Sequence, residues 1–151
     1  MANAMTNLPS SIPIQFLRLD HVVLRARNAP KLVAFYEEVL GCRVERQLPI
    51  GLIQLRAGDA LIDVVPVDSE LGKAGGDPPP SSNGGRNMDH FCLTIDPFEA
   101  DALRAHLSAH QAPFEFADRV YGAEGYGPSV YVQDPEGNTV ELKGPSVDRE
   151  P

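Results

Sequence analysis

Two histidines and two carboxylates lie in repeated, mostly apolar segments of the chain. His21 and His90 each follow an aspartate and precede a short apolar run, while Asp63 and Glu141 lie between aliphatic neighbours. A carboxylate buried in such a setting has to be paired, protonated or bound to a metal. Two imidazoles and two carboxylates are donors that divalent transition metals use in proteins. The sequence therefore predicts one metal site made of these four residues.

Each of these residues also has a simpler interpretation when it is taken alone. A histidine in a strand is more often a half-buried structural residue than a ligand. Asp63 could be a charge on an edge strand that faces water, and Glu141 could be a surface residue paired with Lys143. All four occupy matching positions of an internal repeat, which favours a shared metal over separate explanations.

The elements that position these residues repeat along the chain. Residues 19–24 read Leu-Asp-His-Val-Val-Leu, and residues 88–93 read Met-Asp-His-Phe-Cys-Leu. After each of these strand patterns come a stripe with helical spacing and three short strand-like runs separated by turn residues. We therefore expect an α+β fold with two tandem βαβββ modules, at residues 16–67 and 87–144.

The remaining segments read as connections. Residues 1–15 are expected to be a flexible N-terminus, residues 68–86 a Gly/Pro-rich linker, and residues 145–151 a C-terminal tail. The glycine-rich run at 121–127 is expected to be a loop, which could gate the substrate or could equally be an ordinary mobile connection. Residues 96–99 (Asp-Pro-Phe-Glu) predict a helix start whose N-cap is the aspartate.

Composition narrows the class of protein. The chain has 151 residues and a formal net charge of −8, so an acidic surface disfavours nucleic acid as a partner. No apolar run approaches the length of a membrane span, and no secretory signal pattern is visible. Cys42 and Cys92 are too few for a disulfide framework and read as small buried residues. We expect a cytoplasmic protein that binds neither nucleic acid nor membrane.

Three motifs and the paired modules resemble the vicinal oxygen chelate superfamily. This superfamily includes glyoxalase I, extradiol dioxygenases, fosfomycin-resistance enzymes, methylmalonyl-CoA epimerase and bleomycin-resistance proteins. The motifs are Asp20–Leu24, Ala34–Gly41 and Asp134–Leu142, and the resemblance covers about residues 17–144. It implies a curved, cup-shaped mixed sheet around one divalent metal ion (Ni, Co, Zn, Fe or Mn), and a homodimer.

The resemblance also assigns roles to the four residues. It implies His21, Asp63, His90 and Glu141 as metal ligands. Asp63 stands where glyoxalase I-like members have a glutamate. The shorter aspartate either binds the metal directly or acts through water. In a glyoxalase I-like lyase or isomerase, Glu141 or Asp63 is the implied general base, and the metal stabilises an enediolate.

Four residues are expected to bind substrate. Arg25 and Arg86 match positions where glyoxalase I-like proteins bind the carboxylates of glutathione, although Val67 replaces an expected asparagine. Arg119 and Tyr126 lie in or beside the glycine-rich run. Either arginine of the first pair could instead be a solvated surface charge. The implied substrate is a small molecule, with a glutathione adduct and a catechol as the two classes.

Three other functions remain open at the level of sequence. His21, His90 and Glu141 form the two-histidine, one-carboxylate set of an Fe(II) extradiol-type dioxygenase. A fosfomycin-type thiol transferase is a second alternative. The third is a non-catalytic binding protein of the bleomycin-resistance type, against which the retained ligand set counts.

Overall fold

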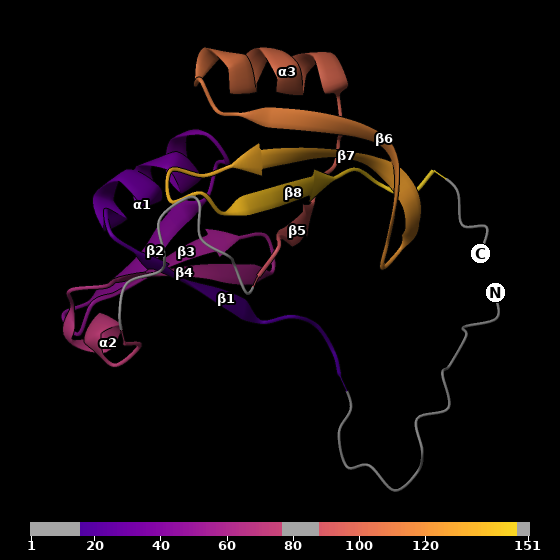
Figure 1. The fold of residues 1–151 in the computed structure, drawn as a ribbon. Helices are drawn as coiled ribbons and strands as arrows, with labels where there is room; N and C mark the ends of the chain where they lie inside the picture. Colours follow the sequence, from indigo (N-terminus) through magenta and orange to yellow (C-terminus); the bar gives the residue numbers. More distant parts are fainter. Residues whose placement is uncertain (1–15, 77–87, 148–151) are drawn as a thin grey trace, which may run out of the picture.

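The computed structural model describes residues 16–76 and 88–147, which form two βαβββ modules (Figure 1). The first module consists of β1 (His21–Ala26), α1 (Ala29–Glu38), β2 (Arg43–Leu48), β3 (Leu52–Ala57) and β4 (Ala60–Pro66), followed by the short helix α2 (Glu70–Lys73). The second consists of β5 (Phe91–Thr94), α3 (Ala100–Ala109), β6 (Phe114–Gly122), β7 (Gly125–Gln133) and β8 (Thr139–Lys143). The predicted order of elements within the two modules is confirmed, whereas α2 lies in the segment expected to be a linker, of which residues 77–86 lie outside the described residues.

The strands of each module form their own four-stranded sheet, in the orders β1-β4-β3-β2 and β5-β8-β7-β6. β1 runs parallel to β4 and β5 runs parallel to β8, while the other neighbouring strands are antiparallel. The two modules thus share one topology. Their eight strands are divided between two open sheets, of which β1 and β5 are edge strands.

Helix α1 begins where the sequence has a capping residue. The Asn28 side chain accepts a hydrogen bond from the backbone N–H of Lys31 at 3.1 Å, and Pro30 lies in the first turn, where its missing N–H costs nothing. The apolar stripe of this helix is buried. It consists of Ala29, Leu32, Phe35 and Tyr36.

The prediction that Asp96 caps the second long helix is wrong. Helix α3 begins at Ala100, and the N-cap residue Glu99 makes no side-chain cap hydrogen bond. Phe98 packs edge-on against Phe116, with ring centroids 6.2 Å apart. This apolar contact is made before the helix begins, while residues 96–97 form a bend.

The glycine-rich run at 121–127 is not a loop, which corrects a second expectation. β6 continues to Gly122 and β7 starts at Gly125, so only two residues make the turn. Tyr121 and Tyr126 are cross-strand partners, and their rings lie 5.0 Å apart. Such aromatic pairs stabilise a hairpin, and this one extends the ladder beyond the predicted strand ends.

The two modules contact each other through their helices and turns. The buried Tyr36 hydroxyl of α1 donates to Asp134 Oδ2, in the turn between β7 and β8, at 2.9 Å. His106 Nε2 of α3 lies 2.7 Å from the backbone oxygen of Val39, just after α1. One cluster of buried apolar residues includes members of both modules. Side chains alternate along a strand, so each sheet also has an opposite face, which we call its open face.

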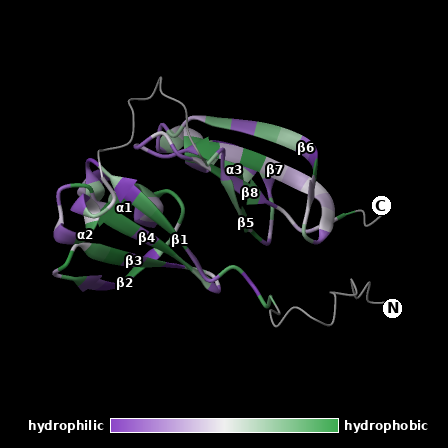
Figure 2. Cartoon of the chain, turned by 60° about the horizontal axis from the view of Figure 1, so that its bottom comes forward, coloured by the Kyte–Doolittle hydropathy of each residue, from purple (hydrophilic) through white to green (hydrophobic). Residues whose placement is uncertain are grey.

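Hydrophobic residues follow β4 and β8, and also the neighbouring edge strands β1 and β5 (Figure 2). β4 and β8 supply the core with Ile62, Val64, Val140 and Leu142. The two longest described helices, α1 and α3, have 10 residues each. No helix in the described residues combines the length and the apolar character that membrane crossing requires.

Candidate metal centre

The histidine that precedes or begins the first strand of each module is oriented by the aspartate before it. Asp20 Oδ2 lies 2.7 Å from His21 Nδ1, and Asp89 Oδ2 lies 2.6 Å from His90 Nδ1. A bond at Nδ1 fixes the ring and leaves Nε2 as the nitrogen that can meet a metal. The hydrogen bond to Asp20 raises the pKa of His21, and the charge of Asp63 acts in the same direction. The same bond lowers the pKa of Asp20.

Glu141 is a buried carboxylate on the open face of β8, with 4% of its surface exposed. Ser129 Oγ donates to its Oε1 at 2.7 Å, and its Oε2 lies 3.2 Å from His90 Nε2. Tyr131, the cross-strand partner of Glu141, meets the His90 ring edge-on at 5.6 Å. Burial raises the pKa of Tyr131, and the charge of Glu141 adds to the effect. The alternative of a surface glutamate paired with Lys143 is therefore wrong.

Asp63 is likewise buried, with 4% of its surface exposed. It lies in β4, between β1 and β3, so the alternative of a charge on an edge strand is wrong. Gln54, its partner on β3, donates from Nε2 toward both carboxylate oxygens, at 3.2 and 3.1 Å. Leu61 pairs with His21 two positions before Asp63 along β4, which places His21 and Asp63 on the same open face.

The four predicted ligands do not gather within one chain. His21 and Asp63 belong to the first sheet, and His90 and Glu141 belong to the second. Across residues 16–76 and 88–147, no three His, Cys, Asp or Glu side chains lie close enough to hold a metal ion. Each chain instead presents two half-sites, a term used here for His21 with Asp63 and for His90 with Glu141.

The expected substrate-binding residues are found in different settings. Arg25 lies on β1, and its Nη2 donates to the backbone oxygens of Gly72 and Gly76 at 2.9 and 2.6 Å. The Arg119 guanidinium lies over the Tyr126 ring, 3.6 Å from its centroid, on the β6–β7 hairpin. Arg86 lies outside the described residues.

Both cysteines are free. Cys92 is exposed, which corrects the expectation of a buried residue, and it pairs with Glu141 across β5 and β8. Partial burial raises the pKa of Cys92 to about 11, with the charge of Glu141 adding to the shift and Lys143 opposing it. Burial also raises the pKa of Cys42 to about 11. Neither thiol is an activated nucleophile near neutral pH.

Several partners of the half-sites were missed from the sequence. Gln54, Ser129 and Tyr131 reach the carboxylates only through cross-strand register. The tight turn at 134–138 is a signal that could have set Tyr131 opposite Glu141, because a hairpin turn fixes the register of its strands. The aspartate before each histidine is part of the sequence repeat, and this repeat could have indicated that the aspartates orient the histidines.

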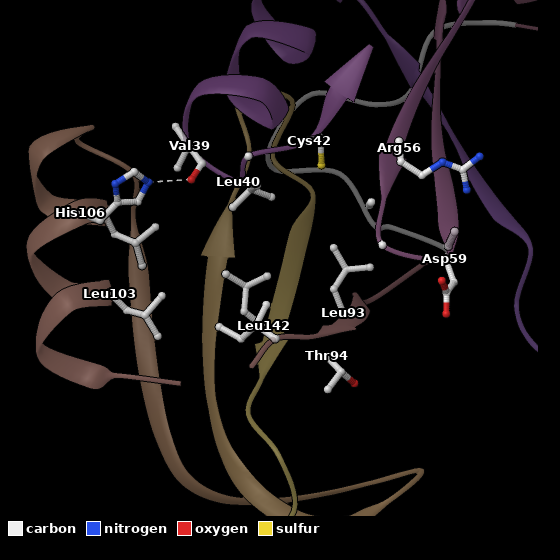
Figure 3. Close-up of a pocket in the computed structure, with 16 residues that line it drawn as sticks. Val39, Leu40, Cys42, Arg56, Asp59, Leu93, Thr94, Leu103, His106 and Leu142 are labelled. Atoms are coloured by element: carbon white, nitrogen blue, oxygen red, sulfur yellow. Dashed lines mark hydrogen bonds between the residues drawn. The ribbon is translucent and has the colours of Figure 1, made fainter. Parts of the chain in front are cut away.

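A cavity of about 560 Å³ lies between the two modules, on the side of the helices (Figure 3). Neither half-site lines it. In Figure 3, His106 approaches it from α3 and bonds the Val39 oxygen, and Arg56 lies at the opposite side. Much of the wall is apolar, including Val39, Leu40, Leu93, Leu103 and Leu142. We place the candidate site at the half-sites because the metal-binding donors lie there and not in this cavity.

The chain belongs to the Glyoxalase/Bleomycin resistance protein/Dioxygenase superfamily, whose family model matches residues 18–142. The sequence is 30% identical over 137 residues to virulence protein STM3117 of Salmonella typhimurium, covering 87% of each chain. An integron cassette protein from V. cholerae has a similar structure, with a TM-score of 0.68 and 26% identity over 89% of this chain and 100% of that one. Lactoylglutathione lyase from Agrobacterium tumefaciens follows at a TM-score of 0.58 and 25% identity, over 84% and 92%.

The donor chemistry of the half-sites fits the divalent metal that this superfamily generally binds. Each half-site offers one imidazole nitrogen and one carboxylate, and both groups are already held by neighbours. Protein metal centres with nitrogen and oxygen donors take four or more ligands. One half-site alone is therefore incomplete, and two together supply two nitrogens and two carboxylates.

Proposed function

We propose that this protein is a metal-dependent enzyme of glyoxalase I-like type, a lyase or isomerase that acts on a small molecule with two neighbouring oxygen atoms. The observation that carries the proposal is the pair of matched half-sites. Each combines a histidine oriented by an aspartate with a buried, hydrogen-bonded carboxylate. We place the enzyme in the cytoplasm, as its composition led us to expect.

We further propose that the active form is a homodimer whose metal centres each combine half-sites from two chains. The half-sites lie on open faces of separate sheets, and the modules contact each other through the helix side. The side chains of His21 and His90 are 47% and 35% exposed, so both remain accessible to a second copy. His90 and Glu141 of that copy would then join His21 and Asp63 of the first chain to form one complete metal centre.

In this proposal, metal binding and proton transfer are assigned to residues of the chain itself. His21, His90 and Glu141, with Asp63 directly or through water, would hold the divalent ion, which supplies Lewis acidity toward substrate oxygens when bound. Glu141 or Asp63 would take the proton from carbon as the general base. Ser129 Oγ donates a hydrogen bond to Oε1 of Glu141, which leaves Oε2 directed toward His90. The likeness to a lactoylglutathione lyase supports a hemithioacetal of glutathione as the first substrate to test.

The experiment that tests this proposal uses two variants, His21→Ala and His90→Ala. Each damages a different half-site, so a homodimer of either variant has no intact centre. In an equimolar mixture that exchanges subunits, half of the dimers are mixed and each contains one intact centre. Bound nickel or cobalt and lyase activity should each recover to about a quarter of the wild-type level. Elemental analysis and a hemithioacetal assay measure the two quantities.

Mixing His21→Ala with Asp63→Ala is the matched control. Both changes fall in the same half-site, so the mixed dimer has no intact centre and nothing should recover. Recovery in neither mixture, with metal bound by the wild type, would show that each centre lies within one chain. A wild type that holds none of the five metals after reconstitution would overturn the enzyme proposal.

A further inference from the structure

Lys143 is a buried residue on the same face as Glu141. It ends β8 two residues after Glu141, so strand alternation directs both side chains to the open face. Only 6% of its surface is exposed. Its cross-strand partners are Thr94 and Ser129, and the Ser129 hydroxyl is already bonded to Glu141. The Lys143 side chain therefore lies within the proposed active centre.

The β6–β7 hairpin is shaped to admit this side chain. A Cβ atom at Gly122 would lie 2.9 Å from Cε and 3.0 Å from Cδ of Lys143, and one at Gly127 would lie 3.0 Å from Nζ. A larger residue at Gly122 would displace the end of the Lys143 side chain, and one at Gly127 would also meet the backbone oxygen of Pro145 at 2.8 Å. The Lys143 stem thus passes close to Gly122 and ends beside Gly127.

The structure shows no counter-charge for this amine. In the described part of the chain, Lys143 Nζ forms no ion pair and no hydrogen bond. The nearby Glu141 is directed toward His90 and Ser129. The Lys143 stem is buried, while Nζ is not among the fully enclosed atoms that lack a hydrogen-bond partner, so it is within reach of solvent or a ligand. A cation that no protein group pairs binds an anion favourably through a charge-assisted hydrogen bond. Binding sites carry such groups where a ligand brings the opposite charge.

We infer that Lys143 binds a carboxylate of the substrate, an assignment that rests on the proposed function. One positive charge balances a carboxylate, whereas a phosphate monoester carries nearly two negative charges near neutral pH. Two residues along a strand span roughly 7 Å. The substrate class is thus an acid whose carboxylate lies a few bonds from the two neighbouring oxygens that meet the metal.

Two probes of equal chain length test this inference. 2-Oxoglutarate and 2-oxopentanoate share the same pair of neighbouring oxygens at one end, and only the first has a carboxylate at the other end. Calorimetric titration of the wild type should show at least about tenfold tighter binding of 2-oxoglutarate. Lys143→Met should abolish this preference, and Lys31→Met, which changes an exposed lysine on α1, should keep it.

Further readouts separate a binding role from a structural one. Lys143→Gln is the second variant, and loss of the preference in both folded variants supports the inference. Removal of an unpaired charge should leave the melting temperature unchanged or raised, whereas loss of a structural ion pair would make it fall. A preference that survives in either variant would overturn the inference, as would inorganic phosphate competing with 2-oxoglutarate more strongly than acetate does.

Metal content is measured in every sample, and each titration is repeated without metal. A wild type that binds no metal but retains the 2-oxoglutarate preference would overturn the proposed function and leave the role of Lys143 supported. A wild type that binds metal but shows no preference would overturn only the role of Lys143.

Discussion

The two carboxylates of the half-sites are held by different donors. Ser129 donates one short hydrogen bond to a single oxygen of Glu141, whereas the Gln54 amide lies about equally far from both oxygens of Asp63. Glu141 therefore keeps one oxygen directed at His90. The Ser129 bond holds the carboxylate that has the longer side chain, and this makes Glu141 the better-oriented of the two candidate ligands.

Replacement of Ser129 by alanine should weaken metal binding without unfolding the protein. The change removes the donor to Glu141 Oε1, so the carboxylate is free to rotate away from His90. Loss of such a supporting bond typically costs about 10–100-fold in metal affinity. Competition with a chromophoric chelator measures the affinity, and Ser108→Ala, an exposed change on α3, is the control. An affinity equal to that of the wild type would contradict the assigned role of Ser129.

At this scale the sequence predicted the four candidate ligands but few of their partners. The ligands repeat along the chain, so comparison of the two halves finds them. Gln54 and Ser129 have no such repeat, because their contacts depend on which residues face each other across antiparallel strands. Whether the four ligands come from one chain or from two stayed open at the level of sequence, since strand order says nothing about how two sheets are placed.

The turn between β7 and β8 links the modules as well as the strands. Asp134 accepts hydrogen bonds from the backbone N–H groups of Glu136 and Asn138, and from the Asn138 side chain. Its Oδ2 also accepts the buried Tyr36 hydroxyl from α1. One carboxylate thus shapes the hairpin that carries Glu141 and joins that hairpin to the first module.

Tyr36→Phe should lower the free energy of unfolding by about 1–2 kcal/mol, because it removes the buried hydroxyl donor to Asp134 Oδ2, leaves that oxygen with the Asn138 side-chain amide, and removes little volume. Urea unfolding followed by circular dichroism measures this change. Tyr121→Phe removes a hydroxyl from an exposed residue and should leave the midpoint almost unchanged. Equal midpoints for the two variants would mean that the Tyr36 bond adds nothing to stability.

The same turn gives stability a defined dependence on pH. Burial raises the pKa of Asp134 above its ordinary value of 3.8, although its hydrogen bonds oppose the shift. The folded protein then holds this proton more tightly than the unfolded chain does. Relative to Asp134→Asn, the wild type should gain stability as pH falls through the raised pKa, and the gain should be complete below pH 3.8.

Urea unfolding of both proteins between neutral pH and pH 3.5 provides the comparison, since other titrating groups cancel in the difference. A difference that stays constant with pH, or that grows against the wild type on acidification, would contradict the raised pKa. The Asp134→Asn variant should keep the turn itself, because the asparagine oxygen can still accept the hydrogen bonds from the backbone N–H groups.

Elements were predicted better than their ends. The alternation of apolar residues in strands and their helical spacing in helices predicted both modules. These patterns are readable because each module buries one face of its strands and helices. The predicted start of α3 and the predicted strand ends at the β6–β7 turn were wrong, since tertiary contacts decided them: Phe98 packs on Phe116, and Tyr121 pairs with Tyr126. Local turn residues, such as glycine, indicate where a chain can bend but not where it must.

At the scale of the whole molecule, two similar modules pack through helices and leave both open faces available. The edge strands β1 and β5 each have a single neighbour in their sheets, so each also has an edge available for a second chain. Under the proposed function, this arrangement accounts for the absence of a complete metal centre among residues 16–76 and 88–147 of one chain. Symmetric pairing of two chains would complete two centres at once.

Removal of the metal should therefore weaken the dimer. An ion that binds only where two chains meet stabilises the assembly, and at 100 times its dissociation constant each site shifts the monomer–dimer equilibrium by about 100-fold. Sedimentation velocity over a dilution series, with nickel and then with a chelator, measures the two dissociation constants. His21→Ala, which cannot form an intact centre, should give the same constant under both conditions. If the wild type also dissociates equally in both, the metal does not lie between the chains, and the centre must be built within one of them.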